Sequence, residues 1–206
     1  MKIDQDFIPY IYDYNTHSLN NSAAVIYAID SNYKIRFFND AWEHFAETNN
    51  GCKIATEWGI GANVINAIEG AQKEFYRELY DASINENLII SHQYECSSST
   101  RYRKFKLIGY PLVNQRGLLL ENYLISEANI AYNEPPLIVD DYQDNYGIIK
   151  QCGHCRKIYN HRQHTWEWCP SLIDQITLKI SHSLCTECLP LYSVGIRNCL
   201  LSPSSL

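Results

Sequence analysis

Residues 23–42, AAVIYAIDSNYKIRFFNDAW, decide the fold of the first half of the chain. Residues 23–30 are apolar and partly β-branched, a Ser-Asn turn follows, and residues 34–38 alternate polar with apolar side chains, which predicts a β-hairpin. Asn39 and Asp40 are suited to cap a helix, because a short polar side chain can accept hydrogen bonds from the first free N–H groups. Residues 23–42 therefore predict two antiparallel strands followed by a helix.

The chain continues with one long helical pattern and then three strand patterns. Apolar side chains recur every three or four positions over residues 63–84, which predicts the longest helix. Residues 88–96, 103–113 and 117–127 are strand candidates separated by polar turns. Two strands, helices and three further strands predict an α+β fold, an antiparallel sheet with helices gathered on one face.

In this order of elements the chain resembles a PAS domain. The residues that carry the resemblance are 24–30, 35–42 (IRFFNDAW), 94–112 (YECSSSTRYRKFKLIGYPL) and 117–126 (GLLLENYLIS). The resemblance implies a sensor domain that holds a small ligand between sheet and helices or binds protein through the sheet. Neither flavin nor haem is expected, because the flavin-photoreceptor string Asn-Cys-Arg-Phe-Leu-Gln is absent and residues 63–84 contain no histidine.

Four of the eight cysteines form two Cys-x-x-Cys pairs, Cys152/Cys155 and Cys185/Cys188. Each pair places two thiolates on one side of a tight turn, and two such turns supply the four sulfurs of a tetrahedral zinc site. The 29 residues between the pairs have room for a short helix near residues 169–176. The sequence predicts one structural zinc ion, which would compensate for the small core of this segment.

Other chemistries of the same cysteines remain open. The string CGHC at 152–155 also occurs in disulfide isomerases, although a thioredoxin-like fold needs it at a strand-to-helix turn and only 51 residues follow Cys155. Four thiolates also suit iron. His154 and His182 are candidates to replace a cysteine or support the site, whereas His161 and His164 are expected in solvent.

The C-terminal strings widen the resemblance. CGHCRKI at 152–158 and SHSLCTECLPLY at 181–192 resemble a module attached to bacterial PAS domains, with Ser183 where the module usually has glycine. The resemblance implies a compact bacterial PAS protein with a zinc-ribbon-like tail.

The predicted organisation has five parts. They are an N-terminal leader (1–21), a PAS-like domain (22–130), a connector (131–145), a four-cysteine zinc module (146–192) and a flexible tail (193–206). The aromatic stretch DFIPYIYDY at 6–14 predicts that the leader packs on the sheet or mediates dimerisation, rather than being merely tethered.

Composition and missing motifs narrow the function. The net charge of -6 argues against a general polyanion binder, so a zinc-ribbon nucleic-acid binder using Arg101, Arg103, Lys104 and Lys106 is an alternative only. No signal peptide, membrane-length apolar run, nucleophile elbow, phosphate loop or His-Glu-x-x-His string is present in the sequence.

The sequence therefore predicts a non-enzymatic, cytoplasmic PAS-type sensor or adaptor that acts through protein–protein contacts. A homodimer and a small ligand in the PAS-like pocket are both compatible with it, and membrane insertion is not expected. A thiol–disulfide or metal-redox protein is the main alternative. Single side chains such as His92 and Cys96 are expected to be ordinary core or surface residues.

Overall fold

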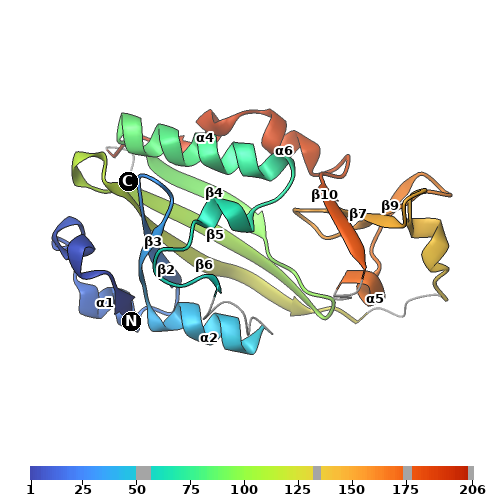
Figure 1. Cartoon of the computed structure of the whole chain (residues 1–206), viewed down its shortest axis with the longest axis horizontal. Coiled ribbons are helices and arrows are strands. Elements are labelled where there is room, and N and C mark those ends of the chain that lie inside the picture. Colours follow the sequence, from blue (N-terminus) through green and yellow to red (C-terminus); the bar gives the residue numbers. More distant parts are fainter. Residues whose placement is uncertain (50–56, 132–135, 174–177, 204–206) are drawn as a thin grey trace.

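The computed structural model describes residues 1–49, 57–131, 136–173 and 178–203, and its main feature is a seven-stranded sheet (Figure 1). The strand order is β1-β3-β2-β6-β5-β4-β11, and each neighbouring pair is antiparallel. The strands are β1 (Lys2–Ile3), β2 (Val25–Asp30), β3 (Ile35–Phe38), β4 (Ile89–Glu95), β5 (Arg101–Pro111), β6 (Gly117–Asn129) and β11 (Leu200–Leu201). The predicted hairpin and the three later strands are confirmed.

Short helices connect and cover the strands. The α-helices that lie wholly within the described residues are α1 (Thr16–Asn21), α2 (Asp40–Thr48), α4 (Ala71–Glu86), α5 (Pro170–Ile173) and α6 (Leu189–Ser193). The 3-10 helices are η1 (Gln5–Tyr10), η2 (Val64–Ala67), η3 (Val113–Gln115), η4 (Val139–Tyr142) and η5 (Ile196–Cys199).

Asn39 caps α2, as the sequence predicts. Its buried side chain accepts hydrogen bonds from the N–H groups of Trp42, at 3.2 Å, and of Ile26, at 3.0 Å. One amide therefore starts the helix and holds it against β2.

The single helix predicted over residues 63–84 is wrong in its first third. The chain forms η2, breaks, and enters α4 only at Ala71. Gly70 sits at the break with φ 64°, and a Cβ there would lie 2.7 Å from the carbonyl oxygen of His182. The apolar spacing runs through the break because Ile68 packs against the same core without being helical.

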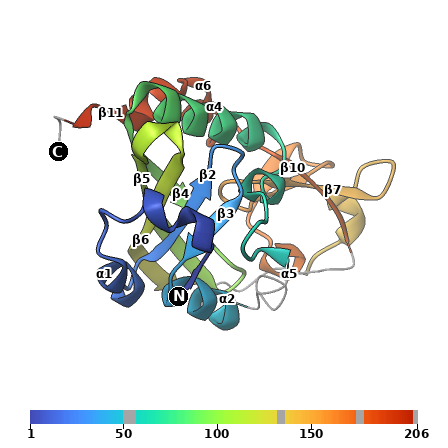
Figure 2. The same ribbon diagram turned by 60° about the vertical axis from the view of Figure 1, so that its left-hand side comes forward.

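Both faces of the sheet are covered, which corrects the expectation of helices on one face only. Leu118 and Leu120 belong to the core under α4, whereas Leu119 between them belongs to a second core with Phe7 and Ile11 of the leader. Neighbouring residues of a strand point to opposite faces, so the leader covers the face opposite α4. Figure 2 shows the leader and α4 on separate parts of the molecule. That the leader packs on the sheet is confirmed, and dimerisation stays a prediction.

A second sheet holds both cysteine pairs. Its order is β10-β7-β8-β9, with β10 parallel to β7 and the other pairs antiparallel. The strands are β7 (Ile148–Cys152), β8 (Ile158–Asn160), β9 (Thr165–Glu167) and β10 (Lys179–Ser183). The helix predicted at residues 169–176 is observed as α5, and residues 174–176 lie outside the described part. We call this sheet with its two cysteine turns the four-cysteine module, and the seven-stranded sheet with its helices the sheet domain.

The expectation of a flexible tail from residue 193 is wrong for the described part of that tail. Strand β11 pairs with the edge of β4, Leu200 opposite Ile90 and Leu201 opposite Ile89. Ile196 and Cys199 also pack against the main core. The apolar side chains of this segment and its pairing with the edge of β4 hold it in place, whereas the serines and the proline near its end predict a frayed tail. No helix in the described residues is long and apolar enough to cross a membrane.

Candidate metal centre

The parallel pairing of β7 with β10 delivers the two cysteine pairs to the same place. Strand β7 ends at Cys152, and Ser183, the last residue of β10, lies directly opposite it. Carboxyl ends of parallel strands meet at one edge of a sheet, so the turn that follows each strand reaches the same corner. The first turn contains Cys155, and the second contains Cys185 and Cys188.

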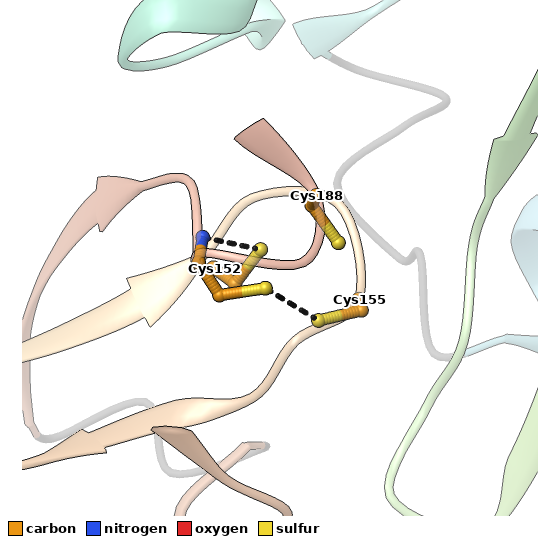
Figure 3. Close-up of side chains that lie close together, drawn as sticks. Cys152, Cys155 and Cys188 are labelled. Carbon is orange, nitrogen blue, oxygen red and sulfur yellow. Dashed lines mark hydrogen bonds between the residues drawn. The ribbon is translucent and has the colours of Figure 1, made fainter. Parts of the chain in front are cut away.

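The four thiols converge, as the sequence predicts. Their sulfurs all lie within 4.8 Å of one another, and Figure 3 shows those of Cys152, Cys155 and Cys188 directed into one space. The Cys155 and Cys185 sulfurs are 3.7 Å apart. A tetrahedron with Zn–S bonds of about 2.3 Å has sulfurs about 3.8 Å apart. The donor set and its spacing fit a four-coordinate metal, and the structure does not identify which metal.

Hydrogen bonds hold the two turns together. The N–H of Cys185 donates to the sulfur of Cys152 at 3.4 Å, and the N–H of Gly153 donates to the carbonyl of Ser183 at 2.8 Å. At the surface, Lys157 donates to Glu187 at 2.6 Å, which joins the strand after the first turn to the second turn. The two backbone bonds satisfy N–H groups that the turns would otherwise leave unpaired.

Burial and hydrogen bonding give Cys152, Cys155 and Cys188 different thiol pKa values. The Cys155 thiol and the neighbouring backbone N–H groups lower the pKa of Cys152 to about 4. The hydrogen bond to Cys152 raises the pKa of Cys155, and burial raises the pKa of Cys188 to about 12. A cation bound by the four sulfurs would stabilise their thiolate forms.

The histidines near the cysteines lie outside the sulfur cluster. His154 is buried, with Nδ1 2.9 Å from the Tyr192 hydroxyl and Nε2 3.9 Å from a Glu95 oxygen. His182 pairs with Glu69 at 2.6 Å. Among the described residues, neither is grouped with the sulfurs as a potential ligand.

The CGHC turn leads into a strand. After Cys155 the chain enters β8, which runs antiparallel to β7. The redox interpretation requires a helix at this point, where its N-terminus would stabilise the attacking thiolate.

The remaining cysteines lie apart from the centre. Cys169 is buried in the small core of the module, Cys96 is exposed, and Cys199 lies beside His92 with 3.4 Å between Sγ and Nδ1. Cys52 lies outside the described residues.

The basic strand does not form the single face that the nucleic-acid alternative requires. Arg103 and Phe105 are buried, and the N–H groups of both Arg101 and Arg103 donate to Glu127, at 3.2 and 2.8 Å. Arg101 and Arg103 lie on one face of β5, and Lys104 and Lys106 lie on the other, because neighbouring residues of a strand point to opposite faces. The two arginines are thus partly neutralised by a carboxylate.

An aromatic cavity of about 230 Å³ lies between α2 and the sheet. The polar groups in its wall bond to one another, because the Tyr94 hydroxyl donates to Asn122 Oδ1 at 2.8 Å and Asn122 Nδ2 donates to the Val25 carbonyl at 3.0 Å. Its walls are Val25, Tyr27, Trp42, Phe45, Tyr94, Cys96, Phe105 and Asn122.

His92 lies outside this wall, as a buried side chain against Phe75 and Tyr76. Burial lowers its pKa to about 4, so the ring is neutral near pH 7.

Sequence reasoning missed the residue that joins the two parts. The Tyr192 ring packs on Phe75 of α4, 4.9 Å between ring centres, and Gln72 donates to its hydroxyl at 2.6 Å. Tyr192 lies four residues after Cys188, at the end of the string SHSLCTECLPLY. This closeness to the second cysteine pair is the sequence signal that connects Tyr192 with the site.

No model of a known protein family matches the chain, and no curated protein sequence matches it.

Proposed function

We propose that the chain is a PAS-type sensor or adaptor whose four-cysteine module binds one structural zinc ion. The order of elements from β2 to β6 supports this, because it is the order on which the resemblance to PAS domains rests. The sensing role depends chiefly on the cavity between α2 and the sheet.

The cavity is suited to a small, uncharged aromatic molecule. Its walls are mostly aromatic, and the amide of Asn122 and the hydroxyl of Tyr94 are already hydrogen-bonded to protein groups. A charged ligand would lose its hydration there without gaining partners, whereas an apolar ring would fill space that water occupies poorly.

A binding experiment with indole as the probe tests the sensing role. We expect indole to bind the full chain with micromolar to millimolar affinity in calorimetry, and Val25→Phe, which adds a ring to the wall, to weaken binding at least tenfold. Tyr12→Phe, at an exposed position of the leader, is the matched control. A wild-type protein that neither binds indole nor retains a small molecule in native mass spectrometry would refute the sensing role.

The output of the proposed sensor is contact with another protein. The apolar side chains of α6 that face solvent, Leu189 and Leu191, together with Val194 just beyond it, offer a surface for such a contact. Aromatic and aliphatic side chains at a surface are the usual centre of protein interfaces.

Thiol–disulfide exchange is the second candidate, and it is favoured by the CGHC turn, where the Cys155 thiol and neighbouring backbone N–H groups lower the pKa of Cys152. A low thiol pKa makes a thiolate available at neutral pH, and the thiolate is the attacking species. If metal-free protein reduces insulin disulfides and Cys152→Ser abolishes this reduction, the thiol–disulfide activity is established. The proposal that the cysteines serve as a structural zinc site is then rejected.

A further inference from the structure

The C-terminal segment (residues 189–203) lies on the sheet domain and begins directly after a cysteine of the metal centre. Cys188 is the residue before α6, and η5 and β11 follow it along α4 and β4 (Figures 1 and 2). The position of Cys188 therefore sets where this segment starts.

A three-way contact at Tyr192 links the centre to the sheet domain. Its hydroxyl is 2.9 Å from Nδ1 of His154, which lies between Cys152 and Cys155, and 2.6 Å from the amide nitrogen of Gln72 on α4. The contact thus brings together both cysteine turns and α4.

Further contacts lie along the rest of the segment. Arg197 donates to both carboxylate oxygens of Glu86, at 2.6 and 2.9 Å, and β11 pairs with the edge of β4. The ion pair is exposed and β11 has two residues, so neither contact holds the segment strongly alone. Tyr192 is buried against Phe75, whereas Ile196, Cys199 and Leu200 pack against the same core while partly exposed.

We propose that the C-terminal segment is a metal-dependent cover over the edge of β4. Metal bound by the four cysteines fixes Cys188 against the first turn, which places Tyr192 on α4 and allows β11 to pair with β4. Loss of the metal separates the turns, frees Tyr192, and opens the edge of β4 together with Phe75 and His92. The opened surface, an unpaired strand edge beside apolar rings, fits an extended apolar peptide strand.

Hydrogen exchange with and without metal tests the cover, which rests on the proposed zinc site. The full chain is loaded with zinc, and half is then stripped with a chelator. We expect peptides covering residues 189–203 and 87–95 to exchange at least tenfold faster in the stripped protein, while those covering β2 and β6 stay protected. Equal protection of residues 189–203 in both forms would overturn the proposal, and so would a loss of protection throughout the sheet.

A zinc measurement on the same samples distinguishes failure of the proposed zinc site from failure of the proposed cover. Protein that binds no zinc contradicts the proposed zinc site itself. Protein that binds zinc but shows no change in exchange contradicts the cover alone.

A variant at Tyr192 tests the link without touching a cysteine. Zinc-loaded Tyr192→Ala should keep its zinc and still show fast exchange in residues 189–203, and Tyr192→Phe, which keeps the ring, should fall between it and wild type. Arg197→Gln is the matched control on the same segment and should resemble wild type. If Tyr192→Ala and Tyr192→Phe both bind zinc and protect the segment as wild type does, Tyr192 is not the link and the proposal fails.

Discussion

The sheet domain and the four-cysteine module differ in how much apolar surface each encloses. Among the described residues, the two cores of the sheet contain fourteen and nine buried apolar residues, whereas the core of the module contains five. A core as large as those of the sheet domain can support an independent fold, whereas a core of five residues cannot. Small modules of this kind are usually stabilised by a metal ion or by disulfides. The four sulfurs lie beyond the carboxyl ends of β7 and β10, where a bound metal would join the two turns that follow these strands.

Removal of one metal ligand should have the largest effect. Cys155→Ser replaces a thiolate with a hydroxyl that binds zinc poorly, and structural zinc contributes on the order of 10 kcal/mol to the folding of small modules. We expect loss of zinc and of amide protection in β7, β8 and β10, with β2, β5 and β6 still protected in hydrogen exchange. Cys96→Ser, at an exposed cysteine outside the cluster, is the control and should leave both unchanged. A Cys155→Ser protein with a fully protected module would show that the module folds without its metal.

A core substitution in the leader should have the next largest effect, on the other part of the molecule. Phe7 is 2% exposed in the second core, so Phe7→Ala should reduce the free energy of unfolding by about 3–5 kcal/mol in urea. Zinc content should not change. The matched variant Tyr12→Ala, at a side chain 79% exposed, should have little effect. Equal stability of the two variants would mean that the leader is merely tethered.

Acid should lower the free energy of unfolding, because His92 is buried as a neutral ring near the contact between the two parts. Burial lowers the pKa of His92 from 6.5 to about 4, so the unfolded chain binds a proton that the folded protein rejects as pH falls from 6.5 towards 4. This linkage removes roughly 2 kcal/mol of stability between pH 7 and pH 5. Urea unfolding at both pH values should show a smaller loss in His92→Phe than in wild type. Identical losses would show that the imidazole is not buried as a neutral ring.

Local patterns predicted the parts of the fold that depend on neighbouring residues. The hairpin, the Asn39 cap and the three later strands follow from alternation and turn chemistry, and the cysteine cluster follows from two paired spacings. These signals lie within a few positions of one another in the chain.

The features that sequence missed depend on distant contacts. At the break, Gly70 lies against the carbonyl of His182, more than one hundred positions away, where a Cβ would not fit. The parallel pairing of β7 with β10 spans the long spacer between the cysteine pairs, and β11 depends on an open edge at β4. The sequence suggests Arg103 as part of a basic face, yet in the structure it is buried and donates to the carboxylate of Glu127, 24 positions away.

Native mass spectrometry of the full chain, after reconstitution with zinc, tests the central claim most directly. The account predicts one zinc ion per chain, retained in wild type and absent from Cys188→Ser. A wild-type protein that binds no zinc, or a Cys188→Ser protein that still retains one, would contradict it.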